Sequence, residues 1–332
     1  MTPTRFSVSC RLSCTLARLY SLSRWLLLAP ALLAGGTALA QPAAFSFGVI
    51  APVLARASDE AGLHDAILAT DADNLAFVVS SGIKTQQEAC TDKLFFKRKE
   101  LFQGAKNGLI VSIAASDWSN CKAGNGRSLA IERLSRIRDL FFEDDFSFGA
   151  SKLPLTRQAS TPKYRTYVEN LRWDIGNMVF ATIHLPSNNN DFVAAAGRNN
   201  EFDDRLVANR DWLHRVFGVA TQKGAAGIVL FCDGDPMAAP DTLGLMGLGT
   251  RRDGFAEIRK QIQTLNARFP GKVILIHGQE SGLAASASTL SWRGKLGDVA
   301  VGAGWIKITV DPATPGLFVL SQQGPGIRTA AQ

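Results

Sequence analysis

Short apolar runs alternate with longer segments of helical periodicity along most of the chain. Apolar runs at residues 45–50, 77–80 and 108–113 have the length and continuity of strands buried on both faces. The segments between them predict helices at 58–68, with Ser58 as N-cap, and at 92–102. These elements predict a sheet covered by helices in the first half of the chain.

The second half of the chain continues this alternation. It predicts helices at 128–142, 203–222 and 254–269, strands at 178–184, 227–231 and 272–276, and a final hairpin of 305–310 and 317–321. A loop rich in Ser, Pro and Asp spans 143–163. We expect one domain, residues 41–332, in which two packed sheets carry helices outside and the late strands are antiparallel.

The first 40 residues have the pattern of a targeting segment. Four arginines and no acidic residue accompany an apolar run at 25–34, and Ala38, Leu39 and Ala40 fit a small-residue cleavage site. The run is shorter than the roughly 20 residues of a membrane span. We expect residues 1–40 to be a signal peptide, with export to the bacterial periplasm or medium and no membrane span after cleavage. An uncleaved anchor is the alternative.

The charge of the chain argues against a nucleic-acid partner. The formal net charge is +7, and removal of the four leader arginines lowers it to +3, which is too small to indicate nucleic-acid binding. A basic run at 93–99 falls on a predicted helix. We expect it to be a solvated helix face, with a binding patch as the alternative.

Three cysteines follow the predicted signal peptide. Cys90 and Cys121 flank one predicted helix and one predicted strand, so that the ends of this unit can meet. In an oxidising compartment they are candidates for a disulfide. Cys232 ends a buried strand, and we expect it to be a small apolar core residue.

The predicted strand ends carry few chemically active groups. The strands at 45–50, 77–80 and 108–113 are followed by residues 51–54, 81–84 and 114–117. Asp117 is the single carboxylate among these twelve residues. Strand ends are where α/β folds place their chemistry. The chain also has no glycine-rich phosphate loop, no nucleophile elbow and no Cys-X-X-Cys pair.

Several segments, spread over nearly all of residues 41–332, carry a resemblance through their order and spacing. They include Phe47-Gly48-Val49-Ile50, Cys90-Thr91-Asp92-Lys93-Leu94-Phe95, Asp117-Trp118-Ser119-Asn120-Cys121, His184-Leu185-Pro186-Ser187-Asn188-Asn189 and Gly304-Trp305-Ile306-Lys307-Ile308-Thr309-Val310-Asp311-Pro312. With these segments the chain resembles the calcineurin-like metallophosphoesterases, in particular a bacterial exported subgroup. The resemblance implies a four-layer α/β/β/α sandwich of the metallo-dependent phosphatase type. It also implies a cleft in which two metal ions activate water.

The metal ligands that the resemblance implies are missing at four motifs. Pro52 and Leu54 stand where an Asp and a His belong, and the bridging Asp is missing after Gly82. Ser116 replaces an Asn ligand, and Ser281 replaces a final His. Each divalent ion needs roughly four to six donors. We therefore predict no inherited binuclear centre, no bound metal and no cofactor.

Two residues of the cleft that the resemblance implies are candidates for catalysis. The resemblance places Asp117 at the family's general-acid position, where it can accept a bond from a substrate hydroxyl, bind a cation or cap the turn at Trp118. His184 ends a strand beside an Asn-rich loop. It hydrogen-bonds a ligand in one reading and anchors the loop in the other, and these two readings stay open.

Further residues are candidates for ligand binding. Asn188 lies in the loop at the cleft rim, and His277 ends a strand near the same cleft, where a structural role is the alternative. Asp233, Asp235 and Glu280 can form a new cation site, with a solvated loop as the expected alternative.

The sequence favours a catalytically degenerate protein that binds an unknown ligand or envelope partner at the former active cleft. One alternative is an active metal-dependent phosphoesterase that uses Mn, Fe or Zn with substitute ligands such as Asp117, His184, Asp233, Asp235 and Glu280. The other alternative is a structural component of the cell envelope. The fold alone does not separate these functions.

Overall fold

A computed structural model describes residues 43–51, 60–193, 199–238, 252–278, 288–302 and 304–323. All of them belong to one compact unit, Gln41–Gln332. The predicted signal peptide, Pro52, Leu54, Ser58, Glu280 and Ser281 lie outside the described residues. Within the described ranges, none of the helices has both the length and the apolar character that a membrane crossing requires.

The first sheet has five strands in the order β12-β11-β1-β2-β3. Parallel pairing joins β1 (Phe45–Ile50), β2 (Val78–Ser81) and β3 (Leu109–Ser112). The predicted C-terminal hairpin, β11 (Trp305–Val310) and β12 (Phe318–Gln323), pairs antiparallel with the other edge of β1. The two ends of the described chain therefore build one sheet.

The second sheet has seven strands in the order β4-β5-β6-β7-β8-β10-β9. Its bounds are β4 Thr156–Arg157, β5 Leu171–Ile175, β6 Met178–Thr182, β7 Gly227–Phe231, β8 Lys272–Gly278, β9 Thr289–Arg293 and β10 Leu296–Val301. The four strands β6, β7, β8 and β10 are parallel, and the outer strands are antiparallel. The expectation of antiparallel late strands is therefore wrong for β8, because α6 connects it to β7 as a parallel neighbour. The strand β10, which the sequence did not predict, also runs parallel to β8, since β9 lies between them in the chain.

The predicted helices are present, with described ends within three residues of the predicted ones. They are α1 Glu60–Asp71, α2 Asp92–Gln103, α4 Ala130–Phe141, α5 Asn200–Gln222 and α6 Ala256–Arg268. The Thr91 side chain caps α2 by accepting from the Leu94 N–H at 3.3 Å, as Thr does at an N-cap. Four short helices also form: α3 Ala115–Trp118 and the 3₁₀ turns Gln158–Ser160, Pro162–Tyr164 and Asn189–Asp191.

Aromatic side chains fill the space between the two sheets. Phe47 and Phe77 stack with ring centroids 5.0 Å apart, and Phe180 of the second sheet meets them at 5.4 and 4.9 Å. Trp173 stacks on Phe231 at 5.7 Å. Such contacts, with the buried area of each ring, hold one sheet face against the other.

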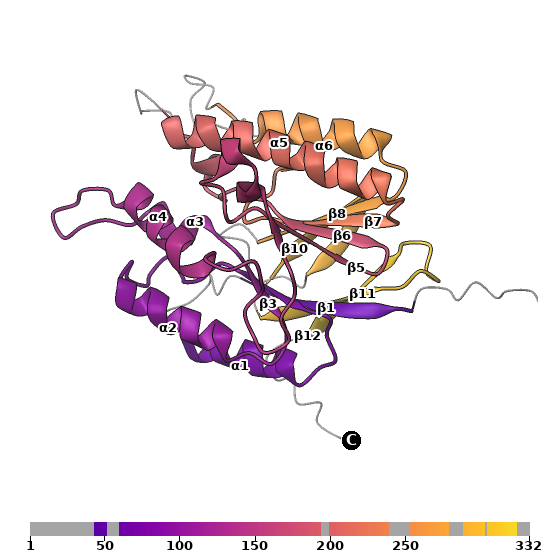
Figure 1. Cartoon of the computed structure of the whole chain (residues 1–332), viewed down its shortest axis with the longest axis horizontal. Helices are drawn as coiled ribbons and strands as arrows, with labels where there is room; N and C mark the ends of the chain where they lie inside the picture. Colours follow the sequence, from indigo (N-terminus) through magenta and orange to yellow (C-terminus); the bar gives the residue numbers. More distant parts are fainter. Residues whose placement is uncertain are drawn as a thin grey trace, which may run out of the picture. The chain divides into compact units, whose positions relative to one another are not determined.

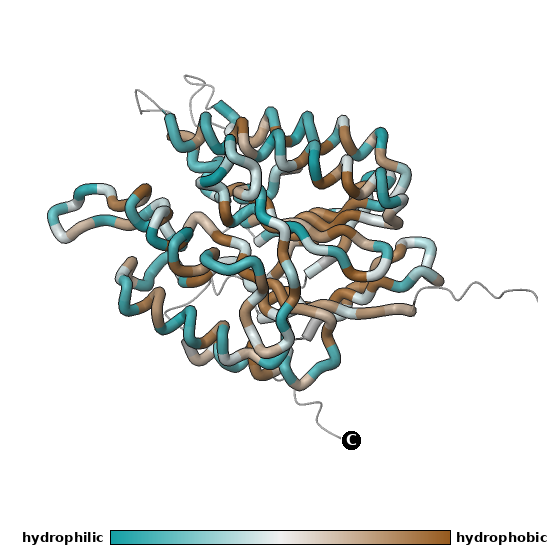
Figure 2. The backbone as a smooth tube through the Cα atoms, viewed as in Figure 1, coloured by the Kyte–Doolittle hydropathy of each residue, from teal (hydrophilic) through white to brown (hydrophobic). Residues whose placement is uncertain are grey.

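Helices cover the remaining sheet faces. A second apolar cluster, which includes Trp212 and Leu213 of α5 and Ile258 and Ile262 of α6, packs on the seven-stranded sheet. Figure 1 shows α5 and α6 on this sheet and α1 and α2 against the five-stranded sheet. In Figure 2 the strands are mostly hydrophobic and the outward helix surfaces hydrophilic. The chain is thus a mixed α/β protein with two mixed sheets and outer helices.

The predicted disulfide between Cys90 and Cys121 is confirmed. Their Cα atoms lie 5.7 Å apart, within the normal range for a disulfide. The bond joins the residue two before α2 to the segment that follows α3. Cys232 is a free, buried cysteine within the apolar cluster beneath α5 and α6, as expected.

Candidate functional site

Asp117 lies in α3 and is fully buried. Its Oδ1 accepts hydrogen bonds from the backbone N–H groups of Ile83 and Lys84 at 2.9 and 3.0 Å, and its Oδ2 accepts from Ala114 at 2.7 Å. Burial raises the pKa of Asp117 to about 6, although these three donors oppose the shift. One carboxylate therefore joins the turn after β2 to the turn after β3. The predicted cap of the turn at Trp118 is only part of this role.

The turn after β2 fits closely around Asp117. Gly82 has φ +96°, which a residue with a side chain rarely adopts. A Cβ on Gly82 would lie 3.2 Å from the Ala114 Cβ and 3.6 Å from Asp117 Oδ1. The Ser116 hydroxyl donates to the Lys84 carbonyl at 3.1 Å. Gly82, after which the resemblance implies a bridging Asp, and Ser116, where it implies an Asn ligand, thus take part in packing between loops.

Asp233 follows β7 and is also buried. Its Oδ2 accepts from the Ala115 N–H at 2.7 Å and from the Ser187 N–H at 2.8 Å. Burial raises the pKa of Asp233 above its ordinary value. Ala115 follows β3 of the five-stranded sheet, and Ser187 follows β6 of the seven-stranded sheet. This carboxylate therefore connects strand ends of both sheets.

His184 is buried beneath the loop that follows β6. Its Nδ1 lies 3.0 Å from Glu169 Oε1, its backbone N–H donates to Asn170, and its carbonyl accepts from Asn209. Nε2 has no partner among the described residues, and the Trp118 ring packs edge-on with its centroid 5.5 Å away. Burial lowers the pKa of His184. These contacts favour the anchoring role, and the ligand-contact role stays a prediction.

Glu169 forms a buried ion pair with Arg138 that the sequence did not reveal. Arg138 donates to both of its oxygens, at 2.5 and 3.0 Å. Burial opposes ionisation of Glu169, but Arg138 and His184 outweigh it and lower its pKa to about 2. Glu169 precedes β5 and Arg138 lies in α4, so no local sequence signal pairs them.

The Asn-rich loop has an unusual backbone. Asn189, Asn190 and Asp191 all have φ between 54° and 56°, a conformation that Asn and Asp tolerate better than most residues. Arg205 donates to the side chain and the carbonyl of Asn190. The exposed Asn188 side chain donates to the Ser119 hydroxyl at 3.1 Å. The loop is thus held in place, with Asn188 at its surface.

A hollow lies beside the carboxyl end of β2. Ser80, Ser81, Lys84, Thr85 and Arg98 are among the residues that line it. The Arg98 guanidinium pairs with Glu88 at 2.5 Å, and the Lys84 ammonium donates to the Thr85 and Glu88 carbonyls. The Thr85 hydroxyl is buried with no partner among the described residues. The hollow therefore offers hydroxyl groups together with cations already balanced by the protein.

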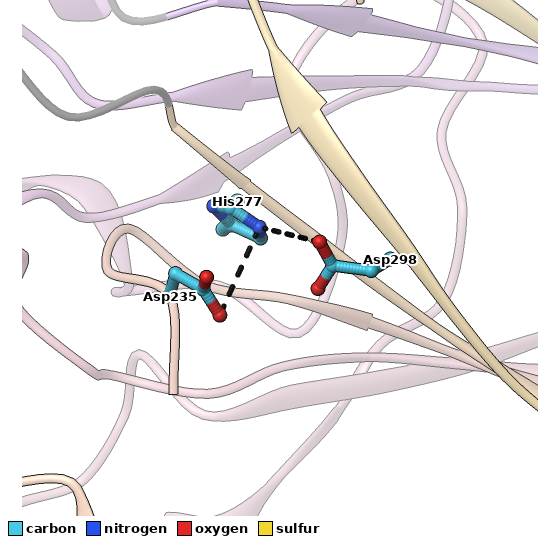
Figure 3. Close-up of side chains that lie close together, drawn as sticks. All are labelled: Asp235, His277 and Asp298. Carbon is cyan, nitrogen blue, oxygen red and sulfur yellow. Dashed lines mark hydrogen bonds and ion pairs between the residues drawn. The ribbon is translucent and has the colours of Figure 1, made fainter. Parts of the chain in front are cut away.

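Asp235 after β7, His277 near the end of β8 and Asp298 within β10 form a cluster (Figure 3). One oxygen or nitrogen from each residue lies within 4.8 Å of the others. Burial lowers the pKa of His277, but the two carboxylates outweigh it and raise the pKa above its ordinary value. The structure thus brings the predicted residues Asp235 and His277 together, without Asp233, whose carboxylate faces Ala115 and Ser187.

Asp298 was missed in the sequence. It is the single acidic residue in β10, whose other members are Leu296, Gly297, Val299, Ala300 and Val301. An acidic residue inside an apolar strand is the signal that marks it, because burial of a carboxylate is costly without a partner. The pairing with His277 becomes visible once β10 is placed next to β8.

Comparison of the chain with models of known protein families finds no match, and comparison with curated proteins finds none either. The function is therefore argued from the residues and the geometry of the site.

Proposed function

We propose that this chain is an exported, catalytically degenerate protein with the four-layer α/β/β/α sandwich of the metallo-dependent phosphatase type. It acts by binding a ligand or an envelope partner at the former active cleft. The two sheets with facing aromatic side chains and the outer helices support the sandwich. The Arg-bearing leader and the disulfide support an oxidising compartment.

The observation that carries the proposal is the use of Asp117 and Asp233 as acceptors for backbone N–H groups. Asp117 accepts three such bonds and Asp233 accepts two. A metal ion that displaced these donors would leave N–H groups unpaired, at a cost of about 1–3 kcal/mol for each buried one. The carboxylates at these strand ends therefore hold the loops together through hydrogen bonds within the protein.

The hollow beside β2 supports a binding role. The hollow has room for about one water-sized group, so its unpaired Thr85 hydroxyl and the neighbouring Ser81 suit one polar group of a ligand, while Arg98 and Lys84 already have acceptors from the protein. Binding here needs hydrogen bonds to hydroxyl groups and does not need a metal ion. Asn188 is exposed at the loop surface and offers its side-chain oxygen to a partner, while its amide nitrogen donates to Ser119 and Asp191.

The test of degeneracy combines metal analysis with an activity assay. The purified protein is incubated with Mn²⁺, Zn²⁺ or Fe²⁺ and then assayed with p-nitrophenyl phosphate and bis(p-nitrophenyl) phosphate. We expect no turnover above the protein-free control. Two metal equivalents per chain together with turnover would overturn the proposal and favour the alternative of substitute ligands.

The test of binding uses the same phosphate esters and inorganic phosphate without metal. We expect a saturable rise in melting temperature that Thr85→Val abolishes. Thr156→Val is the matched control, because Thr156 is exposed on the short strand β4. No response to any of these probes would contradict a small polar ligand at the hollow and favour the alternative of a structural envelope component.

A further inference from the structure

His277 directs one ring nitrogen at two carboxylates. Its Nε2 lies 3.5 Å from Asp298 Oδ2 and 4.0 Å from Asp235 Oδ1, and both contacts leave the same ring atom in Figure 3. The His277 side chain is 5% exposed. Asp298 Oδ1 is buried and has no hydrogen-bond partner among the described residues. Three groups that bear lone pairs thus meet at one point, where His277 is buried and the two aspartates are partly buried.

The surroundings fix which His277 nitrogen carries a proton. Nδ1 lies 2.8 Å from the Gly278 carbonyl oxygen, which can only accept, so Nδ1 carries the proton and donates. In neutral His277 this leaves a lone pair on Nε2, facing the carboxylates. Metal-binding histidines commonly donate their other ring N–H to a carbonyl, and ligating carboxylates are themselves hydrogen-bonded. Asp235 Oδ1 fits this pattern, since it accepts from the Met237 N–H at 2.6 Å.

The distances suit an ion between the groups better than direct hydrogen bonds. A charge-assisted N–H···O bond is about 2.7–2.9 Å long, well below the 3.5 and 4.0 Å observed. Two ligands at about 2.1 Å from a tetrahedral ion are about 3.4 Å apart. The Nε2 to Oδ2 distance matches that separation, and the Nε2 to Oδ1 distance is slightly wider.

We propose that Asp235, His277 and Asp298 bind a single divalent transition-metal ion, Zn²⁺ or Mn²⁺. One imidazole and two carboxylates give a neutral site with a dication, and the remaining positions are available to water or a further ligand. The nitrogen donor argues against Ca²⁺ and Mg²⁺, which prefer oxygen alone. The site goes beyond the proposed function, because binding of a ligand at the hollow does not require it.

This site differs from the two-metal centre that the resemblance implies. Val273 and Leu275 of β8 pack in the cluster beneath α5 and α6, whereas Ile274 and Ile276 face the other sheet. Strand alternation places His277 on the same side as Leu275, and the register places Asp298 opposite Leu275. The proposed ion therefore lies on the helix-covered side of the seven-stranded sheet, and none of its ligands stands at a missing-ligand position.

The test is isothermal titration calorimetry of chelator-treated protein with ZnCl₂ and, separately, MnCl₂. We expect one equivalent to bind, and His277→Gln or Asp298→Asn to weaken binding at least tenfold. His64→Gln is the matched control, because His64 is exposed on α1 with Asp65 only 3.7 Å away and should leave the affinity unchanged. Asp235→Asn keeps the acceptor for Met237 and serves as a third variant if His277→Gln does not fold.

Substitution with Co²⁺ adds a spectroscopic readout. We expect visible absorption bands in the wild-type protein that are lost in His277→Gln and retained in His64→Gln. Absence of binding, or equal affinity in all three cluster variants, would overturn the inference and leave the proposed function intact. Metal binding without phosphoester turnover supports both the metal site and the proposed function. Turnover that His277→Gln abolishes would support the metal site and overturn the proposed function.

Discussion

Asp233 accepts a 2.7 Å hydrogen bond from the backbone N–H of Ala115, across the boundary between the two sheets. Asp233 follows a strand of the seven-stranded sheet, and Ala115 follows a strand of the five-stranded sheet. The same carboxylate also accepts from Ser187. A single buried side chain thus connects three strand ends.

Removal of this connection should destabilise the protein. We predict that Asp233→Ala lowers the free energy of unfolding by about 2–4 kcal/mol, because the buried Ala115 N–H loses its acceptor at about 1–3 kcal/mol and the partly buried Ser187 N–H loses a hydrogen bond worth about 1 kcal/mol. Asp233→Asn should cost less, since it keeps one acceptor oxygen. Urea unfolding followed by circular dichroism measures both changes.

The matched control is Asp174→Ala. Asp174 pairs with Lys223 at 2.6 Å in a solvent-accessible position, where an ion pair contributes about 0–1 kcal/mol. An Asp233→Ala loss no larger than that of Asp174→Ala would contradict the linking role of Asp233.

Two glycine substitutions should have opposite effects. Gly82→Ala should destabilise the protein by about 1–2 kcal/mol or more, because an L-residue at φ +96° is strained and the new Cβ crowds Ala114. Gly218→Ala should stabilise it by about 0.5–1 kcal/mol, because Gly218 lies inside α5 with open space around its Cα. Melting temperatures of the two variants measure the signs, and a stabilising Gly82→Ala would show that the turn after β2 is not held as described.

The Glu169–Arg138 pair should make stability depend on pH. The pKa of Glu169 is about 2 in the folded protein against an ordinary 4.5, so folding favours the ionised form. Its stabilising contribution is complete above pH 4.5 and is lost as the pH falls toward 2. The pKa of His184 lies below its ordinary 6.5, so folding favours the neutral imidazole. Its contribution to stability is therefore also lost as the pH falls, beginning nearer to neutrality.

Glu169→Gln isolates the contribution of the carboxylate. We predict a loss of about 3–5 kcal/mol at neutral pH, because Arg138 and His184 lose a buried charged partner. The difference from wild type should narrow as the pH falls below 4.5. Urea unfolding at a series of pH values measures this difference, and a gap that does not change with pH would contradict the ion pair.

The disulfide should stabilise the protein measurably. Its cysteines are 31 residues apart in sequence, and closing a loop of that length contributes about 3–4 kcal/mol through the entropy of the unfolded chain. We predict that the double substitution of Cys90 and Cys121 to Ala lowers stability by this amount. Dithiothreitol should lower the free energy of unfolding of the wild-type protein by a similar amount and leave that of the double variant unchanged. A wild-type protein insensitive to reductant would contradict this prediction.

Much of the fold follows from local sequence patterns. The apolar runs that became β1, β2, β3 and β7, and the periodic segments of α2 and α4, are visible in single windows of sequence. β10 was not predicted, because Gly297 and Asp298 lower its strand propensity and its pairing with β8 decides its structure. The parallel direction of β8 and β10 likewise depends on contacts between segments distant in sequence.

The site was less predictable than the fold. Sequence reasoning placed Asp117, Asp233 and Asp235 at strand ends, but the partners of Asp117 include Ile83, which lies 34 residues away. The local sequence does not distinguish a carboxylate that accepts backbone N–H groups from one that binds a cation. The structure separates them, because Asp233 faces two N–H donors while Asp235 faces His277.

Anomalous X-ray scattering from crystals grown with Mn²⁺ or Zn²⁺ tests the central claim most directly. That claim is that Asp117 and Asp233 hold strand ends together in place of a binuclear metal centre. The account predicts no anomalous peak within coordination distance of either carboxylate, whatever is found at His277. Two peaks about 3.5–4 Å apart beside Asp117 or Asp233 would contradict it.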